Sequence, residues 1–150
     1  MTKHEKETEP NIKQAVPFFA VSNIEESVRY YIEGLGFEMT HKWIPDGKLE
    51  GCWLQRGGAA IMLQEFRKEG NDFWVPEGKL GIGVSIYFIC KDALAIYREV
   101  TPRGIKASRP IVSNGMWNTG LVDPDGYRIE FESDTDVPDD TKYFQCRAIG

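Results

Sequence analysis

Short apolar runs bounded by turn residues follow one another along the chain, a pattern typical of β-strands. Two segments instead carry apolar residues on one helical face, residues 24–33 and 92–100. Asn23 and Asp92 stand where N-cap residues belong, so both segments are predicted to be helices. The predicted strands cover residues 15–21, 37–44, 49–56, 59–66, 84–90, 105–112, 116–122 and 127–132.

These predicted elements occur twice in the same order: one strand, one helix and three further strands. Similar segments recur at a spacing of about seventy residues. Gly36-Phe37 returns as Gly104-Ile105, and residues 58–63 return as residues 126–131. The repetition predicts an α+β fold of two β-α-β-β-β units that share a cleft.

At 150 residues the chain is the size of one domain, and neither half is expected to fold alone. Polar or charged segments rich in turn residues separate the predicted units and flank them. The predicted division is a polar lead at residues 1–13, repeat one at 14–66, a connector at 67–81, repeat two at 82–133 and an acidic tail at 134–150.

Charge and composition exclude several classes of partner. With 23 acidic and 18 basic residues and no dense lysine or arginine run, the net charge of −5 disfavours binding to nucleic acid. Cys52, Cys90 and Cys146 form no paired motif, so we expect reduced thiols rather than disulfides or a zinc site. No apolar stretch approaches the roughly 20 residues of a membrane span, and the polar start predicts a cytoplasmic protein.

Three motifs resemble those of the vicinal oxygen chelate superfamily: Val21-Ser22-Asn23 before the first helix, Gly34-Leu35-Gly36-Phe37 after it, and Asp-Pro-Asp-Gly-Tyr-Arg-Ile-Glu-Phe at residues 123–131. This superfamily includes glyoxalase I, extradiol dioxygenases, fosfomycin-resistance thiol transferases and bleomycin-resistance proteins. The resemblance covers residues 14–133. It implies a curved mixed sheet, a half-barrel around the cleft, and a homodimer in which two subunits often build each cleft.

The resemblance also identifies where a metal site would lie. Metal-using members take one ligand from each of four strands, and those positions fall here on Val16 (or Pro17 after a slip of one residue), Met62, Ser85 and Glu130. Only Glu130 is a good ligand, and a transition metal needs several nitrogen, oxygen or thiolate donors. We therefore expect no metal and no cofactor.

The two histidines do not change this expectation. His4 lies in the polar lead and His41 lies on a strand that carries no family ligand. Two histidines and a carboxylate therefore cannot be assembled around the cleft. We expect His41 to be an exposed strand residue.

Because side chains alternate along a strand, residues two apart from these positions should share the cleft face. Trp53 and Trp117 are added as wall residues, and Trp74 in the connector could close the mouth. For the aromatic residues and Met62, plain packing in the core or at a dimer interface is an equal alternative. Glu130 is expected to pair either with Arg128 or with a cationic ligand. The predicted ligand-binding residues are Phe18, Trp53, Met62, Gln64, Ser85, Tyr87, Trp117, Arg128 and Glu130; Val16, Ala20, Phe66, Ile89 and Glu132 share the predicted face.

Three functions are compatible with these features. The first is a metal-free protein that resembles bleomycin-resistance proteins and sequesters an aromatic or cationic small molecule. The alternative is a glyoxalase-like lyase or isomerase that uses Glu130 as a base with a weakly bound divalent metal. The third is an interaction module whose cleft its own side chains fill. The first is the hypothesis we take forward, with the ligand and any turnover left open.

Overall fold

The structure is a computed structural model that describes residues 8–144. His4 and Cys146, and the outer parts of the predicted lead and tail, lie outside the described residues. Module 1 consists of β1 (Phe18–Val21), α2 (Ile24–Arg29), η1 (Tyr30–Gly34), β2 (Glu38–Trp43), β3 (Gly51–Arg56) and β4 (Ala59–Glu65). Module 2 consists of β5 (Ser85–Ile89), α3 (Ala93–Val100), η2 (Thr101–Arg103), β6 (Ile111–Ser113), β7 (Met116–Val122) and β8 (Arg128–Asp134).

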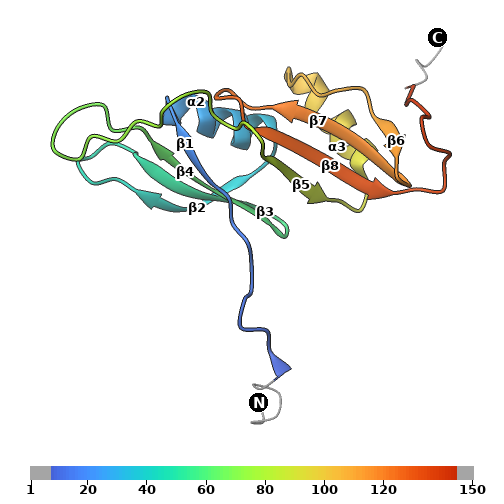
Figure 1. Ribbon diagram of the computed structural model, residues 1–150, viewed down its shortest axis with the longest axis horizontal. Coiled ribbons are helices and arrows are strands. Elements are labelled where there is room, and N and C mark those ends of the chain that lie inside the picture. Colours follow the sequence, from blue (N-terminus) through green and yellow to red (C-terminus); the bar gives the residue numbers. More distant parts are fainter. Residues whose placement is uncertain (1–7, 145–150) are drawn as a thin grey trace.

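The two modules have the same sheet topology and lie side by side along the long axis of the molecule (Figure 1). Module 1 has the strand order β1-β4-β3-β2, and module 2 has the order β5-β8-β7-β6. In each sheet the first strand pairs in parallel with the last, and the other pairs are antiparallel. The predicted α+β fold of two β-α-β-β-β repeats is confirmed, as two open mixed sheets.

The N-cap residues Asn23 and Asp92 predict the starts of the two helices correctly. The side chain of Asn23 accepts a hydrogen bond from the backbone N–H of Glu26 at 3.1 Å, and Asp92 accepts one from Ala95 at 3.1 Å. The first helix ends in a π-helical turn, η1, which sequence periodicity did not predict. Within the described part of the chain, none of the helices combines the length and apolar composition that crossing a membrane requires.

Two strands, β1 and β6, are much shorter than predicted. β1 begins at Phe18 rather than at residue 15, and β6 covers only Ile111–Ser113 rather than residues 105–112. Pro110, which has no backbone N–H, directly precedes β6. Before it, Ser108 binds β7 partly through its side chain, since its Oγ accepts a hydrogen bond from the Gly120 N–H at 2.9 Å. The hydrogen bond to the Ser108 hydroxyl takes the place of regular backbone pairing between this segment and β7.

The modules share one hydrophobic core. Phe19 of β1 stacks on Tyr127, which directly precedes β8, with ring centroids 4.1 Å apart. Phe37 contacts Phe88 of β5 at 6.0 Å, and a side chain at Gly34 would collide with Ile105. Each module therefore completes the core of the other.

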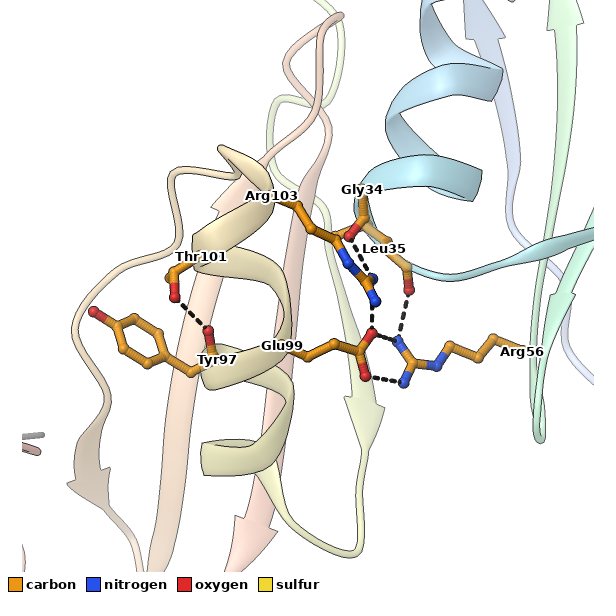
Figure 2. A network of polar contacts seen from close by, with 7 residues as sticks. All are labelled: Gly34, Leu35, Arg56, Tyr97, Glu99, Thr101 and Arg103. Carbon is orange, nitrogen blue, oxygen red and sulfur yellow. Dashed lines mark hydrogen bonds and ion pairs between the residues drawn. The ribbon is translucent and has the colours of Figure 1, made fainter.

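A charged cluster on the surface also joins the modules (Figure 2). The Arg56 guanidinium of β3 donates two hydrogen bonds to the Glu99 carboxylate of α3, at 2.9 and 2.8 Å, and a third to the Leu35 carbonyl at 2.7 Å. Arg103 donates to the same carboxylate at 3.0 Å and to the Gly34 carbonyl at 3.3 Å. A bidentate arginine–carboxylate pair fixes orientation as well as distance.

This cluster predicts a pH-dependent contribution to stability. The hydrogen bonds from Arg56 hold the pKa of the Glu99 carboxyl below its ordinary value of 4.5. A lowered carboxyl pKa stabilises the fold above the ordinary value, and the effect is lost as the pH falls through the folded-state pKa. Because the pair is partly exposed, Glu99→Gln is expected to lower the free energy of unfolding at pH 7 by about 1 kcal/mol.

Urea unfolding of both proteins between pH 7 and pH 3 measures this difference, which should shrink below pH 4.5. Burial raises the pKa of Asp123 and acts in the opposite sense, but this effect is common to both proteins and cancels in the difference. Glu33→Gln, at an exposed position, is the control. A constant difference across the pH range would contradict the prediction.

The C-terminal tail packs against module 2 up to the last described residue. The Thr141 carbonyl accepts a hydrogen bond from the Val112 N–H, and the Tyr143 N–H donates to the Pro110 carbonyl, both at 2.9 Å. The ring of Tyr143 contacts Trp117 at 6.1 Å. Residues 135–144 therefore cover the outer edge of β6, whereas the sequence indicated only an acidic tail.

Candidate functional site

The sheet of module 1 has one face against α2 and one open face. Phe18 pairs with Met62 across β1 and β4, and Met62 pairs with Trp53 across β4 and β3. Residues directly opposite in a sheet share a face, so these three side chains lie next to one another. Their neighbours Phe19 and Leu63 point the other way, into the core. Gln64 lies on the open face two residues beyond Met62.

Trp53 is held in place on this open face. Its indole Nε1–H donates a hydrogen bond to Gln55 Oε1 at 2.9 Å. The exposed imidazole of His41 lies against its ring, with centroids 6.3 Å apart. Phe18, the residue opposite Met62, is 49% exposed. An oriented indole beside an exposed phenyl ring is a suitable surface for stacking a flat ligand.

The connector closes one end of the open face of module 1. The backbone groups of Arg67 and Trp74 exchange two hydrogen bonds, at 2.8 and 2.7 Å. The Trp74 ring meets the edge of Phe18 at 6.1 Å and of Phe66 at 6.5 Å. Trp43, which sequence reasoning missed, lies under the Arg67 guanidinium at 4.9 Å. Trp43 lies two residues from His41 on the same strand, and that alternation was the available signal.

The open face of module 2 has a different chemistry. Tyr87 of β5 lies opposite Glu130 of β8, and Ser85 lies opposite Arg128. Ser85, Tyr87 and Arg128 are exposed, whereas Glu130 is 9% exposed. The Arg128 Nη2 and Glu130 Oε1 atoms are 3.6 Å apart. The structure therefore brings these four predicted residues together, and the pairing of Glu130 with Arg128 is present.

Trp117 does not join the others. It pairs with Ser133 across β7 and β8, and the Ser133 hydroxyl accepts a hydrogen bond from the N–H of Ala93 at the start of α3. Trp117 therefore faces the helix side of module 2, where its ring packs against Tyr143. The expectation that Trp117 belongs to the wall of the cleft does not agree with this placement.

A cavity of about 940 Å³ lies at the seam between the modules. It is lined mainly by three segments: residues 15–17 before β1, residues 56–60 around the β3–β4 turn, and residues 85–90 along β5. Among the predicted ligand-binding residues, Ser85 and Tyr87 line it. The only charged residue in the lining is Arg56, whose guanidinium is bound to Glu99. The cavity is therefore largely apolar and adjoins the open face of β5.

The residues at the family's metal-ligand positions do not fit a transition metal. Val16, Met62 and Ser85 offer an alkyl group, a thioether and a hydroxyl, and Glu130 offers one carboxylate. Within residues 8–144, no three or more histidine, cysteine, aspartate or glutamate side chains are grouped closely enough to hold an ion. His41 lies on module 1, on a different sheet from Glu130.

Sequence comparison identifies a family. The model of the Glyoxalase/Bleomycin resistance protein/Dioxygenase superfamily matches residues 12–131, which covers both modules. No curated protein sequence matches the chain.

Solved structures with the same fold are numerous, at low sequence identity. TioX from Micromonospora sp. ML1 has a TM-score of 0.66 and 17% identity, over 81% of this chain and 98% of its own. The bleomycin resistance determinant encoded on the transposon Tn5 has a TM-score of 0.63 and 20% identity, over 84% of this chain and 100% of its own. TnmS3, an antibiotic binding protein from Streptomyces sp. CB03234, has a TM-score of 0.61 and 17% identity, over 85% and 100%. At these identities the likeness establishes the fold.

Proposed function

The chain belongs to the Glyoxalase/Bleomycin resistance protein/Dioxygenase superfamily, and from this membership we propose that it is a metal-independent binding protein for an aromatic or cationic small molecule. One observation carries the proposal: an alkyl group, a thioether and a hydroxyl stand at three of the four positions where metal-using relatives hold ligands, and aromatic side chains lie beside the thioether on the open face of module 1. Phe18, Trp53 and Met62 form such a surface, and Glu130 is the single carboxylate at those positions. Apolar surfaces with a few placed polar groups are typical of small-molecule sites.

Two of the structural relatives support a binding role. One is described as an antibiotic binding protein and another as a bleomycin resistance determinant. Both share the two-module fold with this chain. Here the proposal rests on the chemistry of the faces, and the relatives indicate which compounds to test first.

We further propose that a second copy of the chain completes the site. Tyr87 is 52% exposed and Ile89 is 69% exposed on β5, whose outer edge pairs with no other strand in the described residues. An exposed apolar strand edge is usually covered in a functional protein. A symmetric dimer would cover two such edges and enclose the open faces.

Native mass spectrometry of freshly purified protein with elemental analysis tests this proposal directly. We expect the mass of a dimer, no stoichiometric transition metal, and any co-purified compound to be a small organic molecule. Calorimetric titration with bleomycin and with a panel of aromatic cations should give saturable binding. Each compound should be recovered chemically unchanged.

Two outcomes would contradict the proposal. One bound transition metal per chain, with conversion of a compound, would favour the lyase or isomerase alternative in which Glu130 acts as a base. If no member of the panel binds, aromatic and cationic compounds are excluded as the ligands of this protein.

A further inference from the structure

The Glu130 carboxylate is an acceptor with unused capacity. It is 9% exposed, and among residues 8–144 no side-chain or backbone donor forms a hydrogen bond with it. It forms an ion pair with Arg128, whose Nη2 atom lies 3.6 Å from Glu130 Oε1. By contrast, Glu132 on the same strand accepts a hydrogen bond from Asn118 at 3.2 Å. Among the described residues Ser27 Oγ is the one buried side-chain oxygen without a hydrogen-bond partner, so solvent reaches the Glu130 oxygens. A ligand that comes to this face can therefore donate a hydrogen bond to them.

Gly120 explains where this carboxylate lies. Gly120 is directly opposite Glu130 across β7 and β8. A Cβ atom built on Gly120 would overlap the Glu130 carboxylate, so the carboxylate rests in the space that a side chain would fill. Gly120 does not adopt a positive φ, so its backbone conformation does not require glycine. A side chain at position 120 would therefore require the Glu130 carboxylate to move out of this space.

The surroundings of this notch favour a positively charged ligand group. The open face of β8 also carries Glu132 and Asp134, and Arg128 is its one basic residue. The Arg128 side chain is 59% exposed, so it can move into solvent when another cation takes its place. Tyr87, opposite Glu130, presents a half-exposed ring beside the carboxylate. A carboxylate next to an aromatic ring suits an ammonium or guanidinium group.

Building on the function proposed above, we propose that Glu130 accepts a hydrogen bond from a positively charged N–H group of the ligand. In this arrangement Gly120 is a positioning residue, because it holds the carboxylate in the notch between β7 and β8. Arg128 pairs with the Glu130 carboxylate in the absence of ligand, and the ligand displaces it when the ligand binds. This role narrows the proposed class of ligands to aromatic compounds that carry a basic nitrogen.

A matched pair of probes tests this assignment: 1-naphthylmethylamine, which is protonated at pH 7, and the neutral 1-naphthalenemethanol. Their affinities for the full-length protein are measured by ligand-observed NMR. A charge-assisted hydrogen bond predicts that the wild-type protein prefers the amine by about five- to tenfold. Glu130→Gln should abolish that preference and leave the affinity for the alcohol unchanged.

Three further variants separate position from charge. Gly120→Ala should also abolish the preference, because its methyl group displaces the carboxylate. Arg128→Gln should raise the affinity for the amine several-fold and leave the alcohol unaffected, and this test does not depend on how well Gly120→Ala folds. Asp134→Asn, which removes an equal charge from the exposed end of β8, is the control and should retain the preference.

The outcomes distinguish the two proposals. If the wild-type protein binds both probes equally, the role of Glu130 is overturned and the binding function stands. If the preference survives Glu130→Gln or is lost in Asp134→Asn, the assignment to Glu130 is also overturned. If neither probe binds the wild-type protein, the aromatic binding function fails and the role of Glu130 fails with it.

Discussion

Replacing Asp123 by alanine is expected to lower the free energy of unfolding by about 3 kcal/mol, because a buried hydroxyl and two backbone N–H groups lose their hydrogen-bond acceptor. Asp123 is 4% exposed. One carboxylate oxygen accepts a hydrogen bond from the Tyr31 hydroxyl at 2.7 Å, and the other accepts hydrogen bonds from the N–H groups of Asp125 and Tyr127, each at 2.9 Å. Burial raises the pKa of Tyr31 well above its ordinary value of 10.0, so this hydroxyl stays a hydrogen-bond donor at neutral pH.

Asp125→Ala is the matched control for this prediction. The Asp125 carboxylate also joins the modules, through the Ser22 hydroxyl at 2.7 Å, but this contact is exposed to solvent. Its loss should cost no more than about 1 kcal/mol. Urea unfolding at pH 7, followed by tryptophan emission, measures both variants. Equal losses for the two would show that burial of Asp123 does not set the cost.

The Asp123 contacts show how much of the turn at residues 123–126 could be read from the sequence. The Asp-Pro-Asp-Gly sequence predicts a tight turn, and the structure confirms it, because the Gly126 N–H donates to the Asp123 carbonyl at 3.1 Å. The partner Tyr31 is 92 residues away in sequence, on η1 of the other module. Local turn chemistry cannot identify such a partner. The turn is therefore also a joint between the modules.

Register decides which of the predicted site residues meet. Phe18, Met62 and Glu130 were assigned to a face by counting in steps of two along strands, and the structure places them on open faces. Trp117 was chosen for its residue type and its strand alone, and it lies on the opposite face of its sheet. A shift of one residue is enough to move a side chain across a sheet. Residue type without register therefore did not place it.

The cavity at the seam lay beyond sequence reasoning for a different reason. Its lining combines Val16 before β1, the turn at Gly57 and Gly58, and both faces of β5. These segments meet only because the two modules pack against each other. The polar contacts that set this packing, such as Arg56 with Glu99, join residues 43 positions apart. No periodicity within one module contains that information.

Trp53→Ala is expected to weaken binding of an aromatic ligand at least tenfold, because it removes the largest ring at the centre of the open face of module 1. The indole lies beside Met62 and is oriented by its hydrogen bond to Gln55. A ring held in one orientation loses little entropy when a ligand stacks on it. Calorimetric titration with 1-naphthylmethylamine measures the loss of affinity.

Tryptophan emission supplies a second measurement of the same prediction. In the wild-type protein, stacking on Trp53 should quench part of the emission, and Trp53→Phe should remove most of that change. Trp117→Phe is the control, because Trp117 faces the helix side of module 2 and packs on Tyr143. It should lower the total emission but keep both the affinity and the quenching. If Trp117→Phe abolished the quenching while Trp53→Phe preserved it, the ligand would lie away from the open face of module 1.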